Sequence, residues 1–420
     1  MYNYLHINMA EGIFRYNEVP SSLHGYGGRA LADALASAFP GSAVFAPGIF
    51  SGCRCASNGR LSVVCSTQNG ILFPSNAGGA AAEAITALGL SAIVIDGGRE
   101  ERGEDELYDL VIGTGGVSVE KSRCRGREIS SSMQILAGAW PKATAVLCAG
   151  LAGEQHLPMA SLAFSGKSLA PSGHAGSGSG AIVCRIRIRS MVFLPGKETV
   201  RAVNPEGFEK AALRFAQLLK QAVIQGAAHA ERCSSRCVID CHRGEGSAAE
   251  AGASSGKKMR WPGQKEFWTT GDKAADERLA LRFTAICDEI GADAFAVGEL
   301  LSVAVKEGVI PGSNAERALE EVRRLGEGTS VLQNMALSWS VARRKGKGRQ
   351  AELQNIVMDS LGICRFACEA AERFAEVKEC MHDMLYSLHG LLPGSLNAMA
   401  HEAWNRENKG SGESADGGRK

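Results

Sequence analysis

Apolar and polar positions follow different patterns in the two halves of the chain. Up to about residue 200, short runs rich in β-branched residues recur between glycines and prolines, and each run has the length of a strand. Helical spacing in this half is best developed at 28–39 and 79–88. The first half is therefore predicted to be rich in β-structure, with strands at 42–46, 61–65, 92–96, 107–112, 143–148, 182–188 and 191–194.

From Pro205 onward the apolar period becomes that of helices. A stripe from Phe208 to Ile224 leads into a cluster of cysteines, and longer helical stretches are predicted at 273–308, 314–342 and 350–391. Between them, 243–258 is low in complexity and predicts a mobile loop. The tail from Asn405 ends in glycine, serine and charged residues, which predicts disorder.

Length and charge narrow the classes of protein. A chain of 420 residues exceeds what one hydrophobic core supports, so two or three domains are expected. With 45% hydrophobic and 22% charged residues, the composition is that of a soluble globular protein. The net charge of +1 argues against a nucleic-acid partner, and the basic run at 343–349 is interpreted as a solvated loop.

Cellular location is predicted from what the sequence lacks. No run of about 18 apolar residues is present to span a membrane, and the N-terminus has neither a basic start nor an apolar signal core. Thirteen cysteines, an odd number, suit a reducing compartment better than an oxidising one. We therefore expect a cytoplasmic protein without a membrane partner.

Cysteine spacing supplies the first candidate chemistry. Cys233, Cys237 and Cys241 lie within one short segment, and Cys364 follows far downstream at the end of Asp359-Ser-Leu-Gly-Ile-Cys364. Three clustered thiols and a fourth from a distant segment are typical ligands of a 4Fe-4S cluster, because each iron takes one thiolate. Zinc accepts the same four thiolates and remains an alternative.

A purely structural interpretation of the triplet is also open. On a helix the three positions would share one face, where small buried cysteines are common. The neighbours Glu231, Arg232, Arg236, Asp240 and His242 are polar, however, and a core stripe would be apolar. This favours a metal or cluster site over core packing.

Ordered motifs give the chain a specific resemblance. It resembles the aldehyde ferredoxin oxidoreductase family, whose members carry a tungsten-pterin cofactor. In the first half the resemblance covers most of the length, and downstream it covers a pair of Asp-x-x-Gly motifs. The segments that carry it are 4–8, 11–13, 27–31, 59–64, 76–79, 92–97, 150–154, 287–293 and 359–364.

The resemblance implies a fold and a set of cofactor contacts. The fold implied is α+β, with an N-terminal domain of two sheets that supports two pterins bound to tungsten or molybdenum, followed by two interleaved helical domains. Arg60, Asn76 and Gly78 would face the pterin and its phosphates, and Gly173 would lie in a second phosphate loop. Asp288, Asp293 and Asp359, together with Ile363 of the second motif, would face the pterin edges. Carboxylates suit this role because they accept hydrogen bonds from amino-pyrimidine N–H groups.

An activity and partners also follow from the resemblance. It implies oxidation of a small aldehyde to a carboxylic acid, with electrons passed through the 4Fe-4S cluster to ferredoxin or another electron-transfer protein. The three clustered cysteines and Cys364 would hold that cluster. An oligomer or a partner subunit is compatible with this interpretation.

Departures from the family pattern affect the substrate side most. The triplet has three residues in each gap, where the family has two and three, and the loop Ser172-Gly-His-Ala-Gly-Ser lacks the family's arginines. A phosphate there would depend on backbone N–H groups and on His174. The position of the expected substrate acid falls on Lys265, which leaves Glu266 as a weak catalytic candidate. Between Gly312 and Gln354 nothing matches the family's substrate segment.

We therefore predict a shortened member of the family with three domains and a tail. The pterin-binding domain is expected at 1–200, helical domains at 201–312 and 313–404, and a disordered tail at 405–420. An alternative function is a non-catalytic paralogue or an electron-transfer subunit that binds the cluster or the pterin without turning over aldehydes.

Overall fold

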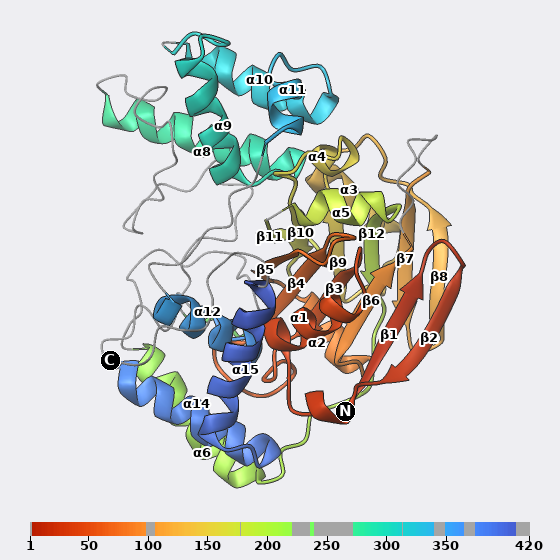
Figure 1. Cartoon of the computed structure of the whole chain (residues 1–420), viewed down its shortest axis with the longest axis vertical. Coiled ribbons are helices and arrows are strands. Elements are labelled where there is room, and N and C mark those ends of the chain that lie inside the picture. The colour runs from red at the N-terminus through yellow and green to blue at the C-terminus, as the bar shows by residue number, and fades with distance from the viewer. Residues whose placement is uncertain are drawn as a thin grey trace.

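The computed structural model describes two sheets and two groups of helices (Figure 1). It describes residues 2–97, 106–176, 178–220, 236–238, 272–312, 314–339, 349–364 and 374–408. The sheets lie between the helical groups along the long axis of the molecule (Figure 1). This is the predicted α+β class. Within the described residues, no helix has the length and apolar character needed to cross a membrane.

The first sheet has six strands in the order β2-β1-β6-β3-β4-β5. β1 and β6 are parallel, and the other neighbours are antiparallel. Helix α1 (Gly28–Ala38) connects β2 to β3, and α2 (Ala81–Ala87) connects β5 to β6. The strands are β1 (Asn3–Asn8), β2 (Ile13–Glu18), β3 (Ala43–Pro47), β4 (Arg60–Ser66), β5 (Leu72–Gly78) and β6 (Ala92–Asp96).

The second sheet repeats this plan. Its order is β11-β10-β9-β12-β7-β8, and β7 and β12 are its parallel pair. Helix α3 (Ile129–Ala139) connects β8 to β9, and α5 (Ser179–Arg185) connects β11 to β12. The strands are β7 (Tyr108–Gly113), β8 (Gly116–Lys121), β9 (Ala145–Ala149), β10 (Leu162–Ser165), β11 (Pro171–Ala175) and β12 (Ile188–Phe193); α4 (Leu151–Glu154) follows β9. The N-terminal half is thus a structural duplication, in which β1–β6 correspond to β7–β12.

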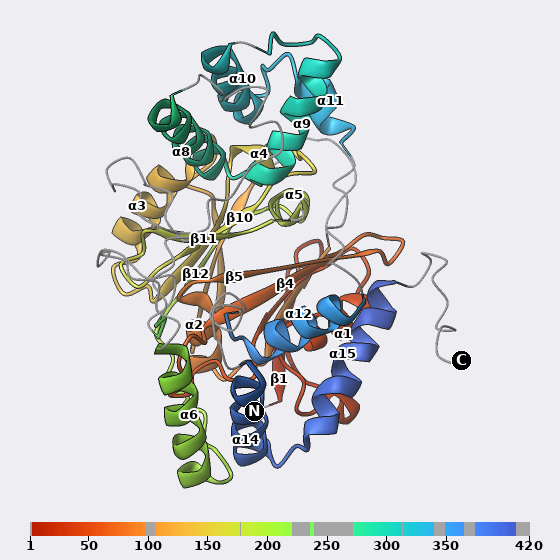
Figure 2. The same cartoon turned by 90° about the vertical axis from the view of Figure 1, so that its left-hand side faces the viewer.

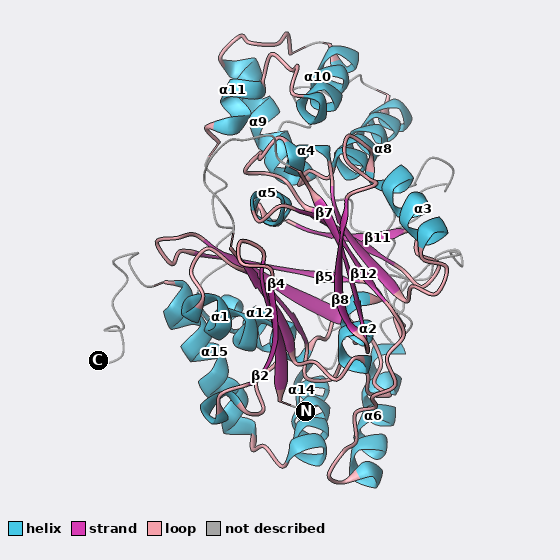
Figure 3. Ribbon diagram, turned by 90° about the vertical axis from the view of Figure 1, so that its right-hand side faces the viewer, coloured by secondary structure: helices cyan, strands magenta, loops and turns pink. Residues whose placement is uncertain are grey.

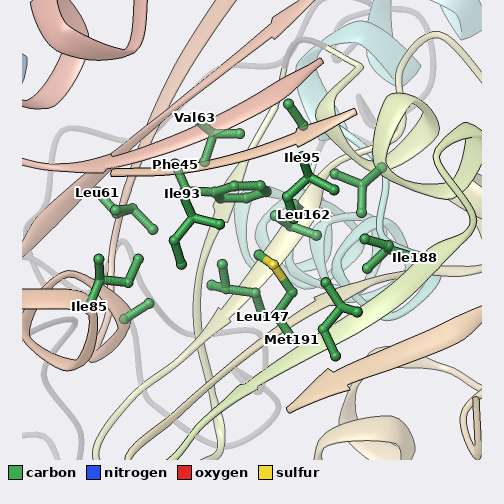
Figure 4. Packing of buried hydrophobic residues seen from close by; sticks show 14 of the residues in the cluster. Phe45, Leu61, Val63, Ile85, Ile93, Ile95, Leu147, Leu162, Ile188 and Met191 are labelled. Atoms are coloured by element: carbon green, nitrogen blue, oxygen red, sulfur yellow. The ribbon is translucent and has the colours of Figure 1, made fainter. Parts of the chain in front are cut away.

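The two sheets bury their inner faces against each other. Successive side chains along a strand point to opposite faces of the sheet, so every second residue enters the core between the two sheets. In β3, Phe45 belongs to the core between the sheets, whereas Val44 packs towards α1. In β9, Leu147 and Val146 divide in the same way between the shared core and α3. Figure 4 shows this shared core, with side chains from both sheets pointing towards one another.

Two groups of helices lie at opposite ends of the molecule. The first group contains α8 (Lys273–Ile290), α9 (Ala294–Lys306), α10 (Ala315–Glu327) and α11 (Gln333–Leu337). The second contains α6 (Pro205–Lys220), α12 (Arg349–Leu361), α14 (Phe374–His389) and α15 (Pro393–Glu407). Figures 2 and 3 show the first group beside α4 and α5, and the second beside α1. Because α6 precedes the first group in sequence but packs with α14, the helical segments are interleaved.

Several elements differ from the predictions. The strand expected at 182–188 is wrong, because Ser179–Arg185 forms the helix α5. Its β-branched residues favour a strand, but Ala181, Val183 and Cys184 lie buried on a helix that packs beside the second sheet. The stretch 273–308 is broken into two helices at Gly291. Helix α15 continues to Glu407, past the expected start of the tail at Asn405. The low-complexity stretch 243–258 lies outside the described residues.

Candidate cofactor site

The first candidate aspartate lies on the last turn of α12, whose end is docked on the N-terminal domain. Gly362 follows the helix with a φ of 74°, which favours glycine. The N–H of Ile363 donates to the carbonyl of Met358 at 3.1 Å, the bond of a glycine-terminated helix end. A Cβ on Gly362 would lie 2.7 Å from Gly48 Cα, so the two backbones touch. This contact fixes Asp359 against the first sheet.

The second candidate aspartate sits at an equivalent end, that of α8. Gly291 has a φ of 69°, and the N–H of Ala292 donates to the carbonyl of Cys287 at 2.8 Å. A Cβ on Gly291 would lie 2.7 Å from Gly150 Cα, so this helix end also touches backbone. Each Asp-x-x-Gly motif is therefore a helix terminus that places its aspartate at the same position in one half of the duplicated domain.

The first half-site is defined by Asp359, Arg60, Ser62 and Asn76. The N–H of Arg60 donates to the Gly362 carbonyl at 3.2 Å. Its guanidinium donates to the side chain of Asn76, and to the Asn76 carbonyl at 3.0 Å. Asn76 Nδ2 donates to Ser62 Oγ at 3.1 Å, and Ser62 Oγ donates to the Asp359 carbonyl at 3.4 Å. The sequence-predicted residues Arg60, Asn76 and Asp359 are thus brought together around one helix end.

A buried arginine lies behind this half-site. Arg29 of α1 is 6% exposed and donates twice to Glu407, each time at 2.7 Å. It also donates to Glu352 at 2.7 Å and lies 3.5 Å from Asp359 Oδ2. Burial alone would lower the pKa of Arg29, but the carboxylates of Asp33, Asp359 and Glu352 outweigh it and raise that pKa. Asp359 therefore has a permanent cation beside it.

The second half-site is defined by Asp288, Ser161 and His174. The N–H of Ser161 donates to the Gly291 carbonyl at 2.8 Å, as Arg60 does to Gly362, so Ser161 is the counterpart of Arg60. In the first sheet Asn76 pairs with Ser62, two residues after Arg60. In the second sheet His174 pairs with Ala163, two residues after Ser161, so His174 corresponds to Asn76. Ser161 Oγ lies 3.2 Å from His174 Nδ1, and His174 Nε2 lies 3.7 Å from Asp288 Oδ1.

The electrostatics of the second half-site differ from those of the first. Burial lowers the pKa of His174 to about 4, against the opposing effect of Glu289 and Asp293. Burial, and then the charges of Glu289 and Asp293, raise the pKa of Asp288 to about 8. Within the described residues no arginine or lysine pairs with Asp288. Both shifts favour the uncharged forms of the imidazole and the carboxyl group.

The two half-sites meet where β5 and β11 run side by side. A Cβ on Gly173 would lie 2.8 Å from the Gly78 carbonyl, so glycine is needed for this close approach. A Cβ on Gly176 would lie 2.5 Å from Asp293 Oδ2. Asp293 Oδ1 accepts from the N–H of Phe295 at 3.0 Å and caps α9, a role that side chains of this type fill at helix N-termini.

The described cysteines of the predicted cluster site also converge. Cys237 and Cys364 are 5% and 6% exposed and belong to one buried cluster. Ser57 links their backbones: its N–H donates to the Arg236 carbonyl at 2.8 Å, and its carbonyl accepts from the N–H of Cys364 at 2.9 Å. Ser57 has a φ of 55°, a strained value for a residue with a side chain. Segments far apart in sequence are thereby held next to each other.

Two further thiols lie in the same buried cluster and were not among the predicted ligands. Cys53 and Cys55 are 5% and 2% exposed, and burial raises the pKa of Cys53 to about 12 despite the nearby Arg236. The described part of the chain contains no group of three or more metal-ligating side chains placed to hold a metal. Cys233, Cys241 and the catalytic candidate Glu266 lie outside the described residues.

Comparison with known proteins identifies the N-terminal half. A sequence model of the aldehyde ferredoxin oxidoreductase N-terminal domain matches residues 4–194. Residues 4–194 therefore carry the N-terminal domain of the aldehyde ferredoxin oxidoreductase family. The match covers both sheets, and therefore both halves of the duplication that carries Arg60 and Ser161. No curated protein matches the chain in sequence.

A solved structure extends the likeness to the helical part. The active-site complex BamBC of benzoyl coenzyme A reductase, in complex with 1,5-dienoyl-CoA, superposes with a TM-score of 0.65 over 97% of this chain and 88% of that one. The sequences are 14% identical, so the likeness shows a shared fold. The helices that follow the family's N-terminal domain here are thus arranged as in that reductase.

The described residues of the two half-sites fit the pterin that the family implies. Half-site one presents Arg60 for an anionic group, and Gly173 and Gly78 provide backbone at close approach. In half-site two, His174 Nε2 is buried without a hydrogen-bond partner among the described residues, which suits a ligand atom. The roles of the predicted residues, Ile363 included, stay predictions. Ser161 was missed, because a single serine in a loop carries no signal until the duplication is seen.

Proposed function

We propose that the chain is a pterin-dependent oxidoreductase that oxidises aldehydes to carboxylic acids and passes the electrons through a 4Fe-4S cluster to ferredoxin or a similar carrier. The observation that supports this most is the pair of Asp-x-x-Gly helix ends docked on equivalent points of the duplicated domain. One of these ends leads directly into Cys364, which Ser57 ties to the segment of Cys237. The proposed cofactor site and the proposed cluster site would thus be joined by one short stretch of chain.

Two pterins with tungsten or molybdenum would supply the redox chemistry, and the protein supplies binding and orientation. Arg60 would bind a phosphate or another anionic part, since its guanidinium lies beside Asn76 with a fixed orientation. Asp359 would orient the ring edge in half-site one, held by the glycine-terminated end of α12. Asp288 and His174 would do so in half-site two.

The proposed reaction balances with water as the oxygen source. An aldehyde and one water give a carboxylic acid, two protons and two electrons, because a new C–O bond replaces the aldehyde C–H bond. The electrons would leave one at a time through a cluster held by Cys233, Cys237, Cys241 and Cys364. Glu266 stays the candidate for proton transfer on the substrate side.

Metal and pterin analysis tests this proposal directly. The protein would be purified without oxygen, and tungsten, molybdenum, iron, zinc and pterin would be measured per chain. We expect about four iron atoms and about one tungsten or molybdenum atom, together with aldehyde-dependent reduction of a viologen dye. Iron and pterin without dye reduction would instead support a non-catalytic paralogue or an electron-transfer subunit. Zinc without a visible iron-sulfur absorption would refute the cluster and the proposed redox function.

A matched pair of cysteine variants makes the cluster assignment specific. Cys364→Ser should lose most of the iron, because a serine hydroxyl replaces one thiolate ligand. Cys380 lies on α14 in the same buried hydrophobic cluster but is not a predicted ligand. Cys380→Ser therefore buries a serine hydroxyl as Cys364→Ser does, without removing a ligand. We expect it to retain the iron of the wild type. Equal iron loss in both variants would show that the effect comes from folding and not from ligation.

A further inference from the structure

The duplication allows the two half-sites to be compared atom by atom. Backbone bonds relate the counterpart residues. Arg60 corresponds to Ser161 through the bonds to the glycine carbonyls, and Asn76 corresponds to His174 through strand register. At these positions the first half-site has a cation and an amide, whereas the second has a hydroxyl and an imidazole. The difference therefore lies in the side chains and not in the fold.

The charged neighbours of the two aspartates also differ, because a cation lies beside Asp359 and acidic groups act on Asp288. Arg29 lies 3.5 Å from Asp359, and it is fixed there by its bonds to Glu407 and Glu352. The neighbour of Asp288 is His174 at 3.7 Å, and the other charges that act on it are the carboxylates of Glu289 and Asp293. Cys287, the preceding residue, is a buried thiol. Among the described residues no arginine or lysine pairs with Asp288, so a negative charge there would be opposed by burial and by two carboxylates, with His174 as its titratable partner.

We propose that the two half-sites present opposite hydrogen-bonding polarity to the cofactor, with Asp359 accepting from N–H groups of the ligand and Asp288 donating to a ligand acceptor. The inference rests on the proposed function, and it changes the role that family resemblance implies for Asp288. Half-site two would select an uncharged ring edge that offers acceptors, such as a pterin carbonyl or ring nitrogen. His174 Nε2, which lacks a described hydrogen-bond partner, faces the same edge as a second contact.

Substitutions at Asp288 test this polarity through the pterin content of the purified protein. Asparagine keeps the shape of a protonated carboxyl group and its donor, so Asp288→Asn should stay within about twofold of the wild type. Asp288→Ala leaves the ligand acceptor unpaired and should lower pterin content about tenfold. Pterin is read from the fluorescence of its oxidised form after denaturation. Equal losses in Asp288→Asn and Asp288→Ala would overturn the proposal.

The corresponding change in half-site one is the matched control. Asp359→Asn replaces a carboxylate beside Arg29 with a neutral amide, whose N–H groups would meet the N–H donors of Arg29 and of the ligand. This variant should therefore lose at least about tenfold more pterin than Asp288→Asn. Because Asp359→Asn also disturbs the Arg29 network, the comparison of Asn with Ala at position 288 stands without it.

An infrared measurement separates failure of this inference from failure of the proposed function. Absence of pterin from the purified protein would refute the proposed function, and the charge state of Asp288 could still be measured. At pH 7 the protein should show the carbonyl absorption of a protonated carboxyl group, and Asp288→Asn should remove it. If that variant removes no such absorption, Asp288 is ionised, and the polarity assigned to half-site two is wrong.

Discussion

Replacing Asp288 with asparagine is expected to reshape how stability depends on pH. Two groups of half-site two titrate differently in the folded and unfolded chain. Asp288 has a folded pKa of about 8, raised from 3.8, and His174 has a folded pKa of about 4, lowered from 6.5. Between pH 4 and 8 the folded protein therefore keeps a proton on Asp288 that the unfolded chain has lost. Stability from this group falls as the pH rises through that window.

His174 acts in the opposite direction over a narrower range. Between pH 4 and 6.5 the unfolded chain binds a proton on this residue that the folded protein does not, so its contribution to stability rises with pH. Each group changes the free energy of unfolding by up to about 1.4 kcal/mol per pH unit. The two contributions cancel from about pH 4 to 6.5. From pH 6.5 to 8 only Asp288 titrates, which predicts a net loss of about 2 kcal/mol.

The assay is urea unfolding of the cofactor-free protein and of Asp288→Asn at a series of pH values. Other groups titrate alike in both proteins, so the difference between the two profiles isolates position 288. The difference should change by about 1.4 kcal/mol per pH unit up to pH 8 and then stay constant. A difference that does not vary with pH would refute the raised pKa of Asp288. In the double variant with Asp288→Asn and His174→Gln, the free energy of unfolding should no longer rise with pH below pH 6.5.

Other contacts give predictions of a simpler kind. Arg29→Met should lower the free energy of unfolding by about 3–5 kcal/mol in chemical denaturation, because it leaves buried carboxylates without their cation; retention of wild-type stability would contradict this. Gly126→Ala should cost about 1–2 kcal/mol through its φ of 71° alone, since nothing lies near its Cβ. Gly362→Ala has a similar φ but meets Gly48, so it should cost clearly more, and equal costs would refute the docking of α12. In cofactor-containing protein, Cys364→Ser should also abolish the visible iron-sulfur absorption.

Much of the N-terminal fold could be predicted from local patterns. The apolar runs that became β3, β4, β6, β7 and β9 are short, rich in β-branched residues and bounded by turns, so each was visible in isolation. The Asp-x-x-Gly motifs were recognised through the family resemblance, but the helix ends at Gly291 and Gly362 were not predicted, because both glycines fell inside expected helices. The approach of Asp359 to Arg60 followed from these motifs and the family resemblance together.

What escaped prediction depends on contacts between distant parts of the chain. Arg29 and Glu407 are 378 positions apart, and neither residue has a local pattern that names its partner. The helix α5 contains Ile182 and Val183, which favour strands, and packing beside the second sheet decides its conformation. Ser161 became a candidate only through its backbone bond to Gly291 and the strand register, neither of which a local sequence pattern specifies. His174 was named from the sequence as a phosphate contact, but its place opposite Asn76 in the duplication was not.

Both copies of the duplicated six-stranded unit lie in one chain, so their sequences can differ. If two identical chains built this pair of sheets, a twofold axis would force every change in one binding pocket to appear in the other. Joining both copies in one chain removes that constraint. The end of α12 can then lead to a thiol, Cys364, while the equivalent end of α8 leads to the carboxylate of Asp293. A single polypeptide can thus place different chemistry at two equivalent positions of a duplicated fold, which a symmetric homodimer of that fold could not do.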